Sequence, residues 1–251
     1  MARARLAGLV DWDVIEDRVR TPTKASEWDD IQDLVSSAIA AYRLPRWSNQ
    51  RNYVELWCEK DALRSVIEPI TEDLHITLMV NRGYSSISAM YDSSKRIRKA
   101  MAIGQHPTIL YLGDFDPSGE DMVRDVRSRL GLLRADGDTR TGEDPEEQWP
   151  EFMDDQNAEI KLTVKKIALT PAQIKQYKPP TNPAKVTDSR YQSFSDQHGD
   201  FSYEVDALPP QALMRIVRGA IEDLMDMDLY KEWIVKEEIE KKKLIAAAKR
   251  I

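Results

Sequence analysis

Four short apolar runs alternate with segments of helical periodicity, and this alternation limits the fold more than any other feature of the chain. The runs are rich in β-branched and aromatic residues and are bounded by turn signals, as strands are. They are residues 53–59, 75–81, 107–113 and 161–169. Strands separated by helices indicate βαβ units, which form a parallel sheet with helices on both faces. The sequence therefore predicts a doubly wound, Rossmann-like α/β fold.

Helical segments are predicted around and between these strands. Apolar residues repeat at helical spacing after Ser26, which is a plausible helix cap. The segment after the first strand is predicted to be a helix that ends near Pro69, because proline interrupts helices. The stretch 170–194 is rich in proline and is predicted to be irregular. Further helices are predicted over residues 84–101, 119–133, 210–225 and from there to residue 251.

Composition limits the cellular setting. The chain of 251 residues is long enough for one large domain or two small ones. Its one cysteine, Cys58, excludes internal disulfides and a cysteine-cluster metal site. No apolar run approaches the ~20 residues that span a bilayer, and the N-terminus is a poor signal peptide. These features predict a cytoplasmic protein without a membrane partner.

Charge is distributed unevenly along the chain. The net charge is −7, but residues 136–160 alone carry ten acidic residues and one arginine. That segment therefore has a net charge of −9, and the remainder, −7 minus −9, is about +2. Residues 161–190 are basic. Acidic and basic runs are usually solvated surfaces, and the alternative reading is a basic surface for phosphates beside an acidic loop.

Three carboxylates are predicted to meet at one edge of the sheet. Asp114 and Asp116 follow the third strand in the sequence DFDPSG, and Glu59 ends the first strand. In open parallel sheets the active crevice lies beyond the carboxyl ends of the strands. Clustered carboxylates repel one another unless a cation neutralises them, and Mg²⁺ is bound by one or two carboxylates with waters and phosphate oxygens. Ser118 is a candidate cap for the following helix.

Three reaction classes use two aspartates in this arrangement. A haloacid-dehalogenase-type phosphatase uses the first aspartate as a nucleophile, although its motif follows the first strand and not the third. A sugar-nucleotide transferase also uses two aspartates, but no companion features accompany them here. The third class is the Toprim domain.

The ordered motifs resemble the Toprim domain, which carries a glutamate after its first strand and D-x-D after a later one. The more detailed resemblance is to the A subunit of topoisomerase VI and the meiotic double-strand-break protein. It rests on Glu59-Lys60, Gly83-Tyr84, the DFDPSG segment and the later segments IALTPAQIKQY and SYEVDAL, over residues 50–225. The resemblance implies DNA strand cleavage dependent on Mg²⁺, or on Mn²⁺ in its place. It implies that Glu59, Asp114 and Asp116 are both the catalytic residues and the metal ligands.

One departure from this family concerns the nucleophile. The A subunit of topoisomerase VI has a winged-helix domain before its Toprim domain, and that domain supplies the attacking tyrosine. Residues 1–50 are too short for it and resemble its tail. The expected organisation is this helical segment, a Toprim domain over residues 51–206 with the acidic insertion 136–160, and C-terminal helices over residues 207–251.

Without such a tyrosine, the resemblance to Toprim nucleases implies hydrolysis of phosphodiesters. Expected partners are DNA and an upstream winged-helix domain or a separate ATPase subunit. A homodimer is a further assembly that the resemblance allows. The competing hypothesis is a non-catalytic DNA-binding or assembly module of a larger complex. Candidate phosphate-binding residues are Lys60, Lys95, Arg96, Lys99, Lys165 and Lys166.

Overall fold

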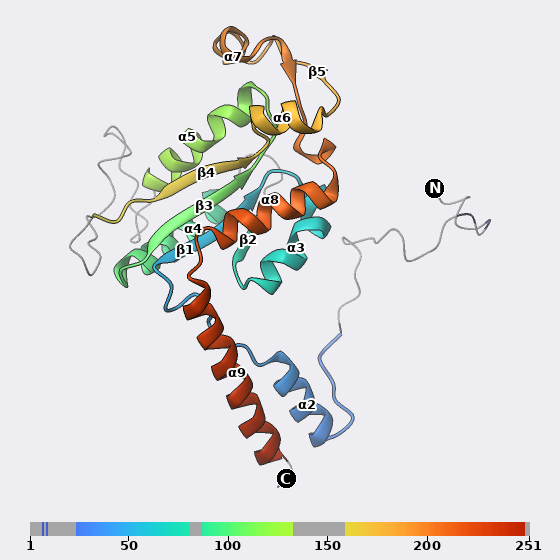
Figure 1. Cartoon of the computed structure of the whole chain (residues 1–251), viewed down its shortest axis with the longest axis vertical. Helices are drawn as coiled ribbons and strands as arrows, with labels where there is room; N and C mark the ends of the chain where they lie inside the picture. The colour runs from blue at the N-terminus through green and yellow to red at the C-terminus, as the bar shows by residue number, and fades with distance from the viewer. Residues whose placement is uncertain (1–6, 8, 10–23, 81–86, 133–158, 249–251) are drawn as a thin grey trace. The chain divides into compact units, whose positions relative to one another are not determined.

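The computed structural model describes residues 7, 9, 24–80, 87–132 and 159–248 (Figure 1). Gly83, Tyr84 and residues 136–158 of the acidic insertion lie outside the described residues. The chain divides into two compact units. The larger comprises Arg43–Ile239, and the smaller comprises Met1–Tyr42 with Glu240–Ile251.

The larger unit is built on a four-stranded parallel sheet, which confirms the predicted α/β fold and all four predicted strands. The strand order is β2-β1-β3-β4, so the first and third strands lie side by side at the centre. The strands are β1 (Asn52–Cys58), β2 (Thr77–Val80), β3 (His106–Leu112) and β4 (Thr163–Ala168).

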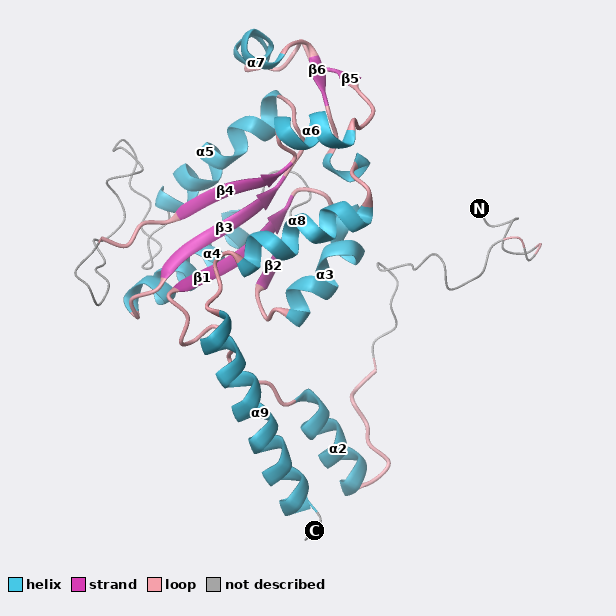
Figure 2. Cartoon of the chain, viewed as in Figure 1, coloured by secondary structure: helices cyan, strands magenta, loops and turns pink. Residues whose placement is uncertain are grey.

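Helices cover both faces of this sheet (Figure 2). One face packs against α3 (Arg64–Asp73) and α8 (Pro210–Glu222), and the other packs against α4 (Ile87–Ala102) and α5 (Pro117–Leu132). Side chains on a strand point alternately to opposite faces of the sheet. Because helices cover both faces, every residue of β1 from Val54 to Cys58 is buried.

The remaining elements are short, apart from one long helix. Residues 1–50 were predicted to be a helical segment, and their described part contains one helix, α2 (Ile31–Ala41). Residues 42–51 form turns and irregular chain. No helix among the described residues is long and apolar enough to cross a membrane. The other elements are η2 (Asp61–Leu63), α6 (Pro171–Tyr177), β5 (Asn182–Pro183), α7 (Tyr191–His198), β6 (Phe201–Ser202), η4 (Val205–Ala207) and α9 (Met227–Ala248).

Three local predictions were wrong. The helix α2 is capped by Asp30, whose side chain accepts from the Asp33 backbone N–H at 2.8 Å, and not by Ser26. The helix α3 continues through Pro69 to Asp73, because the buried side chains of its apolar face offset the hydrogen bond that proline cannot make. The stretch 170–194 contains the helix α6, which a capping box at Thr170 starts.

Candidate active site

Glu59 and Asp114 lie at the same edge of the sheet because the strands that precede them are paired in register. Cys58 at the end of β1 pairs with Leu112 at the end of β3. The Glu59 backbone N–H continues this ladder by donating to the Leu112 carbonyl oxygen at 3.1 Å. The structure thus brings both carboxylates to the predicted edge of the sheet, and the pairing of β1 with β3 puts them at neighbouring strand ends.

Glu59 lies in a half-buried position against β3. The Tyr111 hydroxyl donates to Glu59 Oε2 at 3.3 Å. Burial raises the pKa of Glu59, and the negative charges of Asp114 and Asp116 raise it further. The three predicted carboxylates are therefore close enough to repel one another electrostatically.

Asp114 is held by two donors on one oxygen. Its Oδ1 accepts from the Val205 backbone N–H at 2.8 Å and lies 3.2 Å from Lys60 Nζ. Burial raises the pKa of Asp114, although both of these donors act in the opposite direction. The carboxylate is consequently fixed in orientation while it remains partly desolvated.

The donor Val205 belongs to a segment that closes over the D-x-D loop from far along the chain. Phe115 and Tyr203 form an antiparallel bridge, with backbone hydrogen bonds of 2.8 and 2.9 Å. This bridge places the acidic side chains of Glu204 and Asp206 beside the site. Sequence reasoning missed both residues, and the only signal for them was the SYEVDAL segment.

Lys60 joins these acidic side chains to Asp114. Its Nζ lies 2.8 Å from Asp206 Oδ1 and 3.1 Å from Glu204 Oε2, in addition to the contact with Asp114. Burial alone would lower the pKa of Lys60, but the hydrogen bonds to Asp206 and Glu204 and the charge of Asp114 raise it overall. Lys60 is therefore a cation already surrounded by carboxylates.

Asp116 also serves the local fold. Its Oδ1 accepts from the Gly119 backbone N–H at 2.6 Å, which is the geometry of an N-terminal helix cap for α5. Asp116 therefore takes the capping role that the sequence assigned to Ser118. A side chain at Gly119 would place Cβ 2.1 Å from the Asp114 carbonyl oxygen. The glycine of DFDPSG is thus required for the close approach between the helix and the loop.

Lys166 is the other predicted cation at this edge. Its Nζ lies 2.6 Å from both the Asp114 carbonyl oxygen and Glu120 Oε1. Its neighbour Lys165 is exposed, as alternation along β4 requires. These two lysines consequently point in different directions and do not form one surface.

The cations predicted on α4 lie away from the carboxylates. A crossover helix runs antiparallel to the strands it connects, so the end of α4 lies toward the edge where the strands begin. Lys95 pairs with Asp92 at 2.6 Å, and Arg96 makes two contacts with the buried Glu55 at 2.8 and 3.0 Å. Lys99 lines a pocket at that edge of the sheet.

The carboxylate oxygens of this site are ligands of the kind that a hard divalent cation prefers. Two half-buried carboxylates, Glu59 and Asp114, repel each other, and Mg²⁺ needs only one or two protein carboxylates. As they stand, no three Asp, Glu, His or Cys side chains among the described residues are grouped to hold a metal ion. Binding would require the carboxylates to turn toward one another and Asp114 to share its charge with Lys60.

Neither a protein-family model nor a curated protein matches this chain. The Toprim resemblance therefore stays a prediction from the ordered motifs, beside a parallel sheet compatible with a Rossmann-like fold.

Proposed function

We propose that this chain is a Toprim-like enzyme that cleaves DNA strands with the aid of Mg²⁺, for which Mn²⁺ can substitute. One observation carries the proposal: Glu59 and Asp114 leave adjacent parallel strands at the same edge, where burial raises the pKa of both carboxyls and neighbouring carboxylates raise it further, Asp114 and Asp116 for Glu59 and Asp116 for Asp114. Perturbed acids gathered at one edge are characteristic of functional sites. Stability alone would not favour such an arrangement.

Each residue has a distinct role in this proposal. Asp114 and Asp116 would hold a divalent ion, which would supply Lewis-acid stabilisation of the charge that develops on the phosphate oxygens. Glu59 is a further ligand or the general acid/base, a task for which a raised pKa is suited. Val205 and Lys60 hold the Asp114 carboxylate in its orientation.

A plasmid-nicking assay tests the proposal. We expect the purified chain to nick and so relax supercoiled plasmid in the presence of Mg²⁺ or Mn²⁺. Nicking should stop when EDTA is added. Glu59→Gln and Asp114→Asn should each lower the rate by about 10²-fold or more. Asp196→Asn, which changes an exposed carboxylate of α7, is the matched control and should leave the rate unchanged. Metal-independent nicking, or equal rates in all three variants, would contradict the assignment.

The alternative is a non-catalytic DNA-binding or assembly module, and one observation favours it. Lys60 Nζ already neutralises Asp114, so the carboxylates have a structural cation of their own. In that case calorimetry would detect DNA binding without metal-dependent cleavage, and divalent metal would change the melting temperature alone. A phosphatase, the third reading, would hydrolyse a phosphomonoester chromogen and leave plasmid intact.

A further inference from the structure

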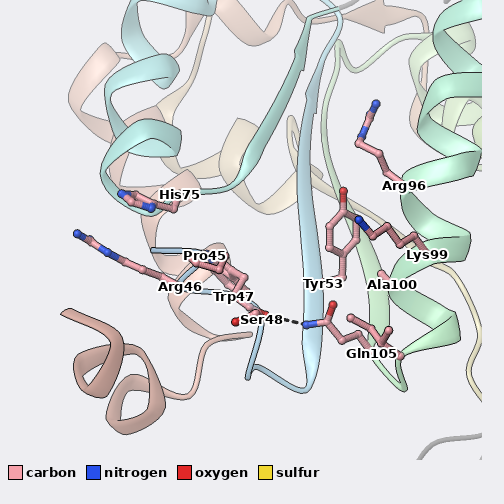
Figure 3. A pocket seen from close by; sticks show the side chains of 11 residues that line it. Pro45, Arg46, Trp47, Ser48, Tyr53, His75, Arg96, Lys99, Ala100 and Gln105 are labelled. Atoms are coloured by element: carbon pink, nitrogen blue, oxygen red, sulfur yellow. Dashed lines mark hydrogen bonds between the residues drawn. The ribbon is translucent and has the colours of Figure 1, made fainter. Parts of the chain in front are cut away.

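A second concave site lies at the opposite edge of the sheet from the carboxylates. The pocket has a volume of about 410 Å³, which is within the ~300–1,000 Å³ typical of small-molecule sites. Figure 3 shows its lining side chains, which come from the segment before β1, the start of β1, the turn before β2, the C-terminal part of α4 and the turn between α4 and β3. Tyr53 begins this edge of β1, whereas Glu59 follows the other end of the same strand.

Two side chains that line the pocket, Trp47 and Gln105, are fixed in place by hydrogen bonds. The Trp47 indole N–H donates to the Leu74 carbonyl oxygen at 2.6 Å. The Gln105 amide nitrogen donates to the Trp47 and Gln50 carbonyl oxygens at 2.7 and 2.9 Å. Because these bonds tie the segment before β1 to the chain before β3, the pocket is preformed.

The charged lining of the pocket is positive. Arg46, Arg96 and Lys99 line it, and none of its described lining residues is acidic. The carboxylates that pair with the two arginines, Glu237 and Glu55, are 1% and 0% exposed and therefore lie beneath the surface. No carboxylate among the described residues pairs with Lys99. The two arginines are consequently neutralised from below, and Lys99 is the lining cation that an anionic ligand would pair with.

The pKa of His75 is also affected by positive charge near the pocket. Burial lowers its pKa, and the positive charges of Arg46 and Arg43 lower it further, against the opposite effect of Glu237. The imidazole therefore lines the pocket in a place where nearby cations already resist additional positive charge. A bound anion would act on His75 in the opposite direction to these two arginines.

We propose that this pocket binds a mononucleotide, whose flat body is the nucleobase and whose anionic group is the phosphate. Trp47, Tyr53 and Ile103 would contact the flat body, and Lys99 would pair with the anionic group. The inference does not depend on the proposed cleavage activity, because none of these residues belongs to the carboxylate site.

Calorimetric titration with four mononucleotides (AMP, GMP, CMP and dTMP) tests the proposal, with EDTA present so that no metal at the carboxylate site contributes. We expect saturable binding of at least one of them and weaker binding of the matching nucleoside and of inorganic phosphate. Lys99→Gln should weaken binding about tenfold by removing a charge-assisted hydrogen bond. Ile103→Glu should weaken it at least as much, because the new carboxylate repels the ligand at a side chain that is 64% exposed.

Lys95→Gln is the matched control, because this lysine is exposed on the same helix, pairs with Asp92 and does not line the pocket. It should leave the affinity unchanged, and so should Asp114→Asn at the other edge. Thermal melts confirm that each variant is folded. No saturable binding of any of the four mononucleotides would overturn the proposal. An affinity that Lys99→Gln and Ile103→Glu leave intact, or that Lys95→Gln lowers equally, would also overturn it.

Discussion

At the scale of single residues, the D-x-D carboxylates have structural and chemical roles at once. Asp116 caps α5, and Asp114 receives the Val205 backbone N–H and the Lys60 ammonium group. Removal of the side chain at either position would therefore lower stability as well as affect any chemistry. Substitutions that keep the hydrogen-bond acceptor but remove the charge separate the two effects.

Asp116→Asn and Asp116→Ala together separate the helix-capping role of Asp116 from the role of its charge. Asparagine caps helices as well as aspartate does, so Asp116→Asn should unfold near the wild-type denaturant midpoint without metal, whereas Asp116→Ala should lose about 1 kcal/mol. Metal that binds the native state stabilises wild type by about 2.7 kcal/mol at a hundredfold excess over Kd, and both variants should lose part of that gain. Urea unfolding with and without Mg²⁺ measures both effects. An unchanged Mg²⁺ response in Asp116→Asn would place the ion elsewhere.

The raised pKa of Glu59 predicts that the stability of the fold depends on pH. Its pKa is raised in the folded state above the ordinary value of 4.5, so the folded protein holds this proton more tightly than the unfolded chain does. Stability is therefore lost as pH rises from the ordinary value through the raised one, and the cost stays constant at higher pH.

Glu59→Gln removes this ionisation and should raise the urea midpoint at pH 7, with the gain disappearing below about pH 4. Unfolding curves between pH 4 and pH 8 measure the difference. Glu232→Gln, at an exposed position of α9, is the control and should show no such trend. A gain that is equal at both ends of the pH range would contradict the electrostatic explanation.

At the scale of elements, the site depends on contacts between segments far apart in sequence. The helix α5 approaches the D-x-D loop so closely that only glycine fits at residue 119. From the other side, the bridge between Phe115 and Tyr203 holds the same loop. The loop is therefore held between a local helix and a segment about 90 residues away.

Gly119→Ala tests the close approach, because its Cβ would meet the Asp114 backbone, which cannot rotate away as a side chain can. We expect a loss of about 1–3 kcal/mol or more, as in other overpacked positions. Gly219→Ala in α8 has nothing within 4 Å of its new Cβ and should instead stabilise the protein by about 0.5–1 kcal/mol. Urea unfolding of the pair measures both. Equal effects of the two substitutions would exclude the steric explanation.

At the scale of the whole molecule, positive charge is divided between the two edges of the sheet. Lys60 and Lys166 are bound to carboxylates at one edge, and Lys99 lines the pocket at the other. Lys165 is exposed on β4. Any phosphate contact by the basic segment therefore depends more on Lys165 than on Lys166.

The salt dependence of DNA binding tests this division of roles. Each phosphate contact contributes about −0.9 to the slope of log K against log salt on duplex DNA. Lys165→Gln should reduce the slope by up to about one unit, whereas Lys166→Gln should reduce it little, because Lys166 pairs with Glu120. Deletion within the acidic residues 136–158 should raise affinity at nearly constant slope by easing repulsion. Anisotropy titrations at several salt concentrations measure the slopes, and a larger change for Lys166→Gln would reverse this assignment.

The sequence by itself determined the sheet and the edge at which the carboxylates gather. Four short runs rich in β-branched and aromatic residues, bounded by turn signals, favour strands between helices, and parallel strands bring their carboxyl ends together. Glu59 and Asp114 therefore lie at one edge, as their positions after those runs predicted, whereas the fold decided that their two strands are neighbours.

Only the tertiary structure decided what surrounds those carboxylates. Local periodicity carries no information on which distant segment will pack on a loop, so Val205, Glu204 and Asp206 were not predicted beside Asp114. The roles of Lys60 and Lys166 were decided in the same way, because a lysine on a strand end is a surface cation or an ion-pair partner according to the acids that the fold brings to it. The pocket at the opposite edge likewise exists because residues 45–48, 53, 75 and 96–105 converge only in the folded chain.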